Sequence, residues 1–212
     1  MTRLAILISG RGSNMERLVA ACRTGDIAAE PVAVIANRLD ATGLQTANRY
    51  GVPASVVDHR AFADRPAFEK ALDGVLADAR ADIVACAGFM RVLTAGFVAR
   101  WEGRLINIHP ALLPAFKGLD THARALAAGV RLHGCSVHFV SAGVDEGAII
   151  GQAALRVAPG DTVQSLAERV LVLEHLLYPR CIDALARGQV RYDNGRARVD
   201  AAVAANLAIL AG

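Results

Sequence analysis

The sequence predicts an α/β protein whose mostly parallel central sheet carries helices on both faces. Short apolar runs alternate with helical patterns from the first residues onward. Hydrophobic residues make up 54% of the 212 residues, which suits strands that are covered on both faces. A chain of this length can bury a substantial core. We therefore expect a single domain over 1–212, with an N-terminal half of 1–105 and a C-terminal half of 106–212.

The N-terminal half predicts five strands with helices between them. The expected strands are Leu4–Ile8, Val32–Ala36, Ser55–Val57, Ile83–Cys86 and Leu105–Ile108. The expected helices are Asn14–Arg23, Ala41–Tyr50, Pro66–Arg80 and Thr94–Trp101. Pro66 is well placed because proline is tolerated in a first helical turn. Strands and helices that alternate in this way predict parallel strands joined by right-handed crossovers.

The C-terminal half is less regular. We expect a helix over Thr121–Ala128, then strands over Gly134–Val140 and Ile149–Val157 that pair with each other. A long helix is expected over Thr162–Ala186, with Asp161 as its N-cap. The sequence Asp193-Asn194-Gly195 predicts the turn of a small terminal hairpin.

Composition argues against several classes of protein. The formal net charge is +3, and no block of lysine and arginine is interleaved with aromatic residues, so we expect no nucleic-acid groove. No apolar run reaches the roughly 18 residues that a membrane helix needs, so no membrane association is expected. The first apolar run, at Leu4–Ile8, is too short for a signal peptide. We expect a cytoplasmic protein that is a monomer or a weak homodimer.

The cysteine and histidine pattern does not predict a metal site. The four cysteines are scattered, without a C-x-x-C pair, and we expect buried reduced thiols at Cys86 and Cys135. His133 and His138 lie on one expected strand at an odd spacing, which predicts opposite faces. A metal ion held by both is therefore not expected.

The segment Asn107-Ile108-His109-Pro110 carries the strongest chemical signal. Residues i and i+2 of a strand point to the same side, so the Asn107 amide and the His109 imidazole can converge on one group. Pro110 favours a chain that leaves the sheet at this point. An amide donor beside a titratable imidazole suits a reaction in which a carbonyl oxygen gains negative charge.

Further segments could contribute to a site. The turn Ser9-Gly-Arg-Gly-Ser-Asn14 leads into a helix, whose N-terminus can bind phosphate; a plain turn capped by a side chain is equally open. A catalytic imidazole also needs a nearby anion, and Asp145 and Glu146 are equal candidates for it. Glu174-His175 would by default be a solvated pair, although a carboxylate facing a cleft could accept hydrogen bonds from sugar hydroxyls.

Together these segments resemble the folate-dependent phosphoribosylglycinamide formyltransferases. The resemblance covers nearly the whole chain and rests on these segments: Ser9–Asn14, Gly88–Leu93, Asn107–Pro114, His133–Val140, Asp145–Gly147 and Glu174-His175. It implies a Rossmann-like formyltransferase fold, and transfer of a formyl group from the co-substrate 10-formyltetrahydrofolate to glycinamide ribonucleotide in purine biosynthesis. The phosphate site would lie in the N-terminal half and the catalytic and folate sites in the C-terminal half. No metal is implied.

The resemblance also implies roles for individual residues. By position, the catalytic residues are Asn107, His109 and Asp145; the substrate-binding residues are Gly12, Ser13, Asn14 and Glu174; and the folate-binding residues are Arg65, Met90, Arg91, Val92, Leu93 and Asn107. The chain departs from its relatives at Leu171, where lysine or glutamine is common, and at Ala115 and Asp120, where polar or basic residues are common.

Three other functions compete with this interpretation. Methionyl-tRNA formyltransferase would be expected to continue into a further C-terminal domain. Formyltetrahydrofolate deformylase would need an added N-terminal regulatory domain, whereas the first strand is expected at Leu4. A non-catalytic nucleotide-binding module could use the same fold, but the Asn107, His109 and Asp145 set argues against it.

Overall fold

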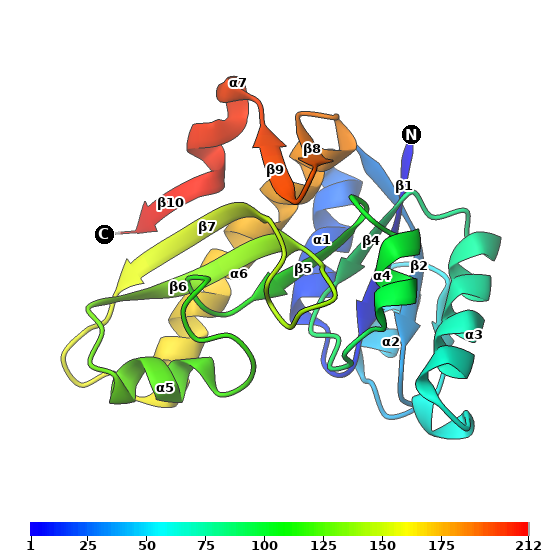
Figure 1. The fold of residues 1–212 in the computed structure, drawn as a ribbon, viewed down its shortest axis with the longest axis horizontal. Helices are drawn as coiled ribbons and strands as arrows, with labels where there is room; N and C mark the ends of the chain where they lie inside the picture. The colour runs from blue at the N-terminus through cyan, green and yellow to red at the C-terminus, as the bar shows by residue number, and fades with distance from the viewer. Residues whose placement is uncertain (212) are drawn as a thin grey trace. The chain divides into compact units, whose positions relative to one another are not determined.

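The computed structural model describes residues 1–211. They form two compact units, one of Met1–Asn107 and one that begins at Ile108 (Figure 1). The single domain expected from chain length stays a prediction.

The N-terminal unit is built on parallel strands in the order β5-β4-β1-β2-β3. Their bounds are β1 Thr2–Ile8, β2 Ala29–Ala36, β3 Ala54–Val56, β4 Ile83–Cys86 and β5 Leu105–His109. The direction of strand order reverses beside β1, which lies between β4 and β2. In open α/β sheets, ligands bind outside the carboxyl ends of the strands at such a reversal. The residues after β1, β2, β3 and β4 are therefore the ones to examine for a site.

Helices cover both faces of these strands. Helices α1 (Ser13–Thr24) and α2 (Gly43–Arg49) pack on one face, and α3 (Arg65–Asp78) and α4 (Ala95–Arg100) lie on the other (Figure 1). A 3₁₀ turn, η1, spans His59–Ala61 after β3. The packing follows from periodicity, because α1 buries Met15, Leu18 and Val19 on one side.

Strand β2 begins three residues earlier than the sequence predicted. The reason lies at Pro31, which pairs with Leu4 just before a register shift, after which Ala33 pairs with Ala5. Proline lacks an N–H and is tolerated at bulges. Strand β3 pairs only with Val34–Ala36, so no ladder bond on that side is needed from Pro31.

The C-terminal unit contains a smaller sheet with the order β10-β7-β6. Strand β6 (Leu132–Phe139) pairs with β7 (Ile149–Arg156), as predicted, and the pair is antiparallel. Strand β10 (Ala208–Ala211) is parallel to β7. Helix α6 (Val163–Ala186) packs against β6 and β7. Helix α5 (Thr121–Ala127) precedes β6.

The predicted hairpin is confirmed. Strands β8 (Val190–Asp193) and β9 (Arg196–Val199) are antiparallel. Asn194 and Gly195 between them have φ of 46° and 80°, as a two-residue type I′ turn requires. The sequence did not predict α7 (Ala201–Ala204), η2 (Ala205–Leu207) or β10.

The predicted N-cap of α6 was wrong by one residue. Thr162, not Asp161, caps the helix: its side chain accepts from the Ser165 N–H, and the Ser165 hydroxyl accepts from the Thr162 N–H. This reciprocal pair is a capping box. Asp161 instead accepts from the Ala158 N–H and from Arg169. Thr162 and Asp161 are both good caps by residue type, so local sequence alone did not separate them.

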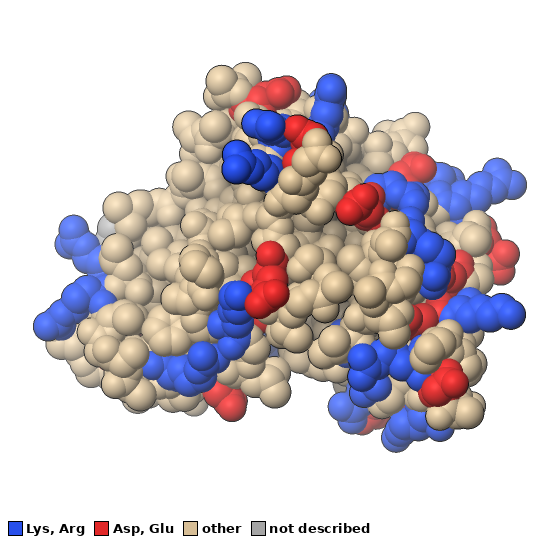
Figure 2. All heavy atoms as spheres, viewed as in Figure 1, with Lys and Arg blue, Asp and Glu red and all other residues tan. Residues whose placement is uncertain are grey.

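The predicted fold class is confirmed: a mostly parallel central sheet, helices on both of its faces and a small antiparallel hairpin near the C-terminus. None of the helices in the described part of the chain has the length and apolar character that a bilayer crossing requires. On the surface over α2 and α3, Figure 2 shows basic and acidic side chains interspersed. The loops that precede α2 and α3 contain the ion pairs Arg38–Asp40 and Arg60–Asp58.

Candidate active site

His109 is the last residue of β5 and is buried, with 5% of its surface exposed. Its Nδ1 lies 3.3 Å from Asp145 Oδ2. Its Nε2 lies 3.0 Å from the Phe116 carbonyl oxygen. A carbonyl can only accept, so Nε2 carries a hydrogen and donates to it. Both ring nitrogens therefore face acceptors, an arrangement that the doubly protonated imidazolium satisfies.

Asp145 is placed by the loop between β6 and β7. Its backbone is in the left-handed region, with φ of 52°, and its side chain is 12% exposed. Oδ2 accepts from the Gly118 N–H at 2.9 Å. Glu146, the alternative carboxylate, points elsewhere and pairs with Lys117 Nζ at 3.0 Å, with 56% of its side chain exposed. The structure therefore places Asp145, and not Glu146, as the anion beside His109.

A second imidazole lies on the other side of the same carboxylate. His138 Nε2 is 3.6 Å from Asp145 Oδ1, and His138 Nδ1 is 2.8 Å from the Phe139 carbonyl oxygen. Burial alone would raise the pKa of Asp145. The hydrogen bond from His138, the backbone N–H of Gly118 and the charge of His109 outweigh burial, so the pKa lies below its ordinary 3.8. Asp145 is thus held as a carboxylate at neutral pH.

His133 belongs to the same region. It is fully buried, its Nε2 lies 3.1 Å from His122 Nδ1, and its ring packs edge-on against Phe116. The register shift between Val137 and His138 leaves out Ile150 of β7, so the extra residue lies on β7 and not on β6. The placement of His133 and His138 on opposite faces of β6 stays a prediction. Burial, and then repulsion from His122 and His109, lower the pKa of His133 from 6.5 to about 4.

This pKa predicts a pH dependence of stability. Above pH 6.5 His133 is neutral in both folded and unfolded chains; between 6.5 and about 4 the unfolded chain takes up a proton that the folded chain does not. As the pH falls through this window, the free energy of unfolding should decrease by on the order of 3 kcal/mol. Below about pH 4, His133 should cause little further change. Urea unfolding of His133→Gln at several pH values checks this. An unchanged slope in the variant would contradict the assignment.

The segment after His109 is fixed by hydrogen bonds to the buried Ser136 and the half-buried Gln152. The Ser136 hydroxyl donates to the Ala111 carbonyl at 2.7 Å and accepts from the Leu113 N–H at 3.0 Å. Gln152 Nε2 donates to the Leu113 carbonyl at 2.9 Å. The β6–β7 hairpin therefore sets the path of the chain just beyond the histidine. The sequence did not predict the roles of Ser136, Gln152 and His138.

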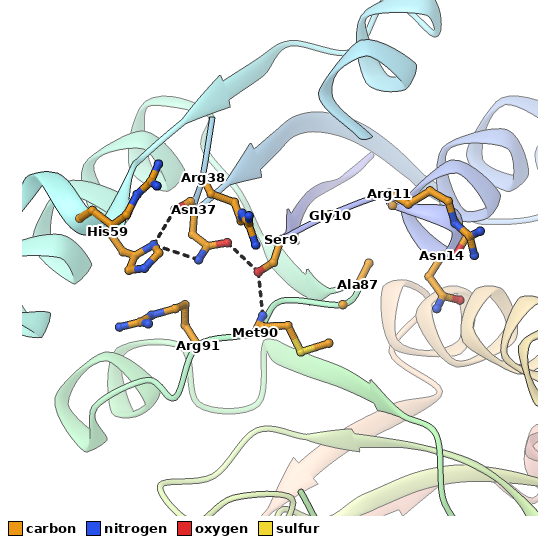
Figure 3. Close-up of a pocket in the computed structure, with 14 residues that line it drawn as sticks. Ser9, Gly10, Arg11, Asn14, Asn37, Arg38, His59, Ala87, Met90 and Arg91 are labelled. Carbon is orange, nitrogen blue, oxygen red and sulfur yellow. Dashed lines mark hydrogen bonds between the residues drawn. The ribbon is translucent and has the colours of Figure 1, made fainter. Parts of the chain in front are cut away.

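A pocket of about 630 Å³ lies within the N-terminal unit, at the carboxyl ends of β1 to β4. It brings together five of the predicted binding residues, namely Gly12, Ser13, Asn14, Met90 and Arg91 (Figure 3). The pocket lining also includes residues that the sequence did not predict: Arg11, Asn37, Arg38, His59 and Arg60. Their shared signal is a place in the loop that follows a parallel strand, where polar residues mark binding sites. Arg65, Val92 and Leu93 are not among the residues that line it.

The pocket includes the N-terminus of α1. Gly12 occupies the N-cap position with φ of 74°, and no side chain caps the helix. The first-turn N–H groups and the positive end of the helix dipole are therefore offered to an anion. Gly12, and not Ser13 or Asn14, is therefore the N-cap residue, and phosphate binding at this turn stays a prediction.

The remaining predicted residues lie at other places. Asn107 is on β5, two residues before His109, and is half-buried. Glu174 is on α6 and is 8% exposed, so it is not part of a solvated pair. Arg65, the first residue of α3, is exposed. The departure at Leu171 lies one turn before Glu174 on the same helix.

Comparison with known proteins identifies the family. A family model described as formyl transferase matches residues 2–182. The chain is 40% identical to the phosphoribosylglycinamide formyltransferase of Escherichia coli K12, over 93% of each chain. It is 46% identical to the trifunctional purine biosynthetic protein adenosine-3 of Bos taurus over 92% of this chain, but spans only 19% of that protein.

Solved structures agree with this result. The phosphoribosylglycinamide formyltransferase of Coxiella burnetii superposes with a TM-score of 0.92 at 39% identity, covering 100% of this chain and 99% of that one. The glycinamide ribonucleotide transformylase 1 of Symbiobacterium toebii gives a TM-score of 0.92 at 44% identity, with 94% of each chain covered. The chain belongs to the formyl transferase family.

Proposed function

We propose that the chain is a phosphoribosylglycinamide formyltransferase, which transfers the formyl group of 10-formyltetrahydrofolate to the amine of glycinamide ribonucleotide in purine biosynthesis. The observation that carries this proposal is the buried pair of His109 and Asp145, 3.3 Å apart, in a chain of the formyl transferase family. A cytoplasmic location and a monomeric or weakly dimeric state stay predictions of the sequence.

The reaction needs a formyl donor whose carbonyl carbon is electrophilic, and a path that takes one proton from the amine to N10 of the folate. The neutral amine of the ribonucleotide attacks the formyl carbon and forms a new C–N bond, while the formyl oxygen takes up negative charge. Collapse of this tetrahedral intermediate breaks the bond to N10 of the folate. The amine loses one proton and N10 gains one, so the products are the formylated ribonucleotide and tetrahydrofolate.

In this mechanism the residues of β5 stabilise the oxyanion. The Nε2–H of His109, which donates to the Phe116 carbonyl in this structure, donates to the formyl oxygen instead. The Asn107 amide, on the same side of the strand by position, supplies a second hydrogen bond. One such donor is typically worth about 10²–10³ in rate. Asp145, 3.3 Å from His109 Nδ1, orients the imidazole and takes part in the proton path toward N10.

The proposed binding residues divide between the two substrates, the ribonucleotide and the reduced folate. The uncapped N-terminus of α1, with Gly12, Ser13 and Asn14, binds the ribonucleotide phosphate. Glu174 accepts hydrogen bonds from its ribose. The reduced folate is assigned to the 88–93 loop and Arg65, with Asn107 as a further contact. The first two lie in the N-terminal half, so this folate site is not confined to the C-terminal half as expected from the sequence.

A direct assay tests the function. The protein is incubated with glycinamide ribonucleotide and 10-formyltetrahydrofolate, and release of tetrahydrofolate is followed with time. Turnover should require both substrates. Release of tetrahydrofolate from the donor alone would indicate a deformylase, and no turnover at all would contradict the proposal.

The phosphate site gives a separate prediction. Gly12→Ala forces an alanine into φ of 74° and brings its Cβ to 3.1 Å from Met15 Cε and 3.3 Å from Gly43 Cα. The turn must shift, so KM for the ribonucleotide should rise about ten-fold or more with little change in KM for the folate. Steady-state kinetics with each substrate varied in turn measure this.

Gly25→Ala is the matched control. Gly25 lies at the other end of α1, with φ of 84° and nothing within 4 Å of a Cβ. It carries a similar backbone penalty of about 1–2 kcal/mol without touching the pocket. Its KM values should equal those of the wild type, and an equal rise in both variants would remove the argument for a phosphate site.

A further inference from the structure

A chain of hydrogen bonds links the carboxyl ends of four parallel strands in the N-terminal unit (Figure 3). Ser9, directly after β1, donates from Oγ to Asn37 Oδ1 at 2.6 Å, and Asn37 directly follows β2. The Asn37 carbonyl lies 2.8 Å from His59 Nδ1, beyond β3. Ser9 Oγ also accepts from the Met90 N–H, beyond β4, at 2.7 Å. Ser9 and Asn37 are 7% and 2% exposed.

Ser9 holds the loop that carries Met90. Within residues 1–211, the hydrogen bonds of segment 88–93 are both made to Ser9: the Ser9 N–H donates to the Gly88 carbonyl at 3.1 Å, and the Met90 N–H donates to Ser9 Oγ at 2.7 Å. The segment has no helix or strand of its own. Met90 is 67% exposed and Val92 is 52% exposed, so packing contributes little at those two positions. Gly88 is therefore held by the Ser9 backbone, and the exposed middle of the loop, at Met90, is held by the Ser9 hydroxyl.

Asn37 fixes the direction of that hydroxyl. Because Asn37 Oδ1 takes the Ser9 O–H, the lone pairs of Oγ are left for the Met90 N–H. Asn37 is itself held through its backbone, where its N–H donates to the Ile8 carbonyl at 3.3 Å and its carbonyl accepts from the His59 N–H at 3.3 Å. The two hydrogen bonds therefore run in one direction: the Met90 N–H donates to Ser9 Oγ, and the Ser9 O–H donates to Asn37 Oδ1.

We propose that Ser9 and Asn37 are positioning residues for the reduced folate. Ser9 is the first residue of the phosphate-binding turn, and its hydroxyl keeps the 88–93 loop in place relative to that turn. Asn37 accepts the Ser9 O–H, which leaves Ser9 Oγ oriented to accept from the Met90 N–H. Neither residue is assigned contact with a reacting atom. The inference rests on the proposed function, because it takes the 88–93 loop as part of the folate site.

Removing the hydroxyl should affect one substrate more than the other. In Ser9→Ala the Met90 N–H loses its partner, and the fraction of loops in the binding-competent position falls, which raises the apparent KM in proportion. We expect KM for 10-formyltetrahydrofolate to rise on the order of ten-fold. KM for the ribonucleotide should stay within about two-fold, because the turn keeps its own bond between the Gly43 N–H and the Gly10 carbonyl.

The experiment compares Ser9→Ala, Ser9→Thr, Asn37→Ala and the double variant Ser9→Ala/Asn37→Ala. Thr46→Val is the matched control, because Thr46 is a buried hydroxyl residue of the same unit outside the pocket lining. Ser9→Thr keeps the hydroxyl and should restore most of the folate affinity. The double variant should bind folate no more weakly than Ser9→Ala alone, because both changes break one linked pair.

The outcomes separate a positioning role from a merely structural one. Equal rises in both KM values, a similar folate effect in Thr46→Val, or additive effects in the double variant would overturn the proposal. If Ser9→Ala did not fold, Asn37→Ala should still raise KM for the folate alone. If the wild type showed no turnover, the proposed function would fail. The ratio of the Kd for tetrahydrofolate in each variant to that in the wild type would still test the role of the loop.

Discussion

Replacing Asp145 with asparagine is expected to lower kcat by about 10²–10³, while KM for both substrates changes by less than about three-fold. Asparagine can still accept from the Gly118 N–H, which lies 2.9 Å from Oδ2. What it removes is the negative charge 3.3 Å from His109 Nδ1, and with it the support for the imidazolium that stabilises the oxyanion. Initial rates measured across pH separate this loss from a shift of the pH optimum.

Glu146→Gln is the matched control for this variant. Glu146 is the next residue on the same loop and loses the same charge, but its carboxylate pairs with Lys117 at the surface. Exposed ion pairs contribute little, so its kcat should stay within about two-fold of the wild type. If Asp145→Asn kept near-full kcat at every pH, the role of Asp145 would be wrong.

Gly147→Ala should have the second large effect, on folding as well as activity. A Cβ at this position would lie 1.6 Å from the Phe139 carbonyl oxygen and 3.3 Å from His138 Nδ1. The first contact is with the backbone of β6, so the 143–147 loop must move away from that strand. We expect the free energy of unfolding to fall by about 3 kcal/mol or more. Asp145 would leave His109 with it, so kcat should fall as for Asp145→Asn.

Gly143→Ala provides the control on the same loop. The three atoms nearest to its Cβ would all belong to the side chain of Glu146. That side chain is exposed and can rotate away. Urea unfolding and kcat should therefore stay near the wild type. Similar losses in Gly143→Ala and Gly147→Ala would mean that the loop tolerates no change at all, and the specific role given to the contact with β6 would be withdrawn.

Much of the fold could be predicted because local sequence and tertiary structure agree. The strands of the N-terminal unit are continuous apolar runs, and Asn194-Gly195 is a turn sequence with one common geometry. The elements after β9 were missed because Ala201–Ala211 has neither a helical stripe nor an alternating pattern. Strand β10 forms by pairing with β7, which is information from a distant part of the chain.

The candidate site could be predicted only in part. The Asn107-x-His109-Pro signal is local to a few residues. The choice between Asp145 and Glu146 depends on a left-handed backbone at Asp145, which the residue types of this loop did not predict. Ser9 and Asn37 each directly follow a strand, and that placement could have marked them. Their hydrogen bond joins residues 28 positions apart, so only the parallel pairing of β1 with β2 brings them together.

The burial of the cysteines determines which thiol a chemical label can reach. Burial raises the pKa of Cys86 to about 12 and also raises the pKa of Cys135 and of Cys181 well above the ordinary value of a thiol. The thiolate is the form that reacts. Cys22, half-buried on α1, is left as the position that maleimide dyes modify first. A fluorophore there would lie on the helix whose N-terminus enters the pocket, and the native chain would need no added cysteine to report ligand binding.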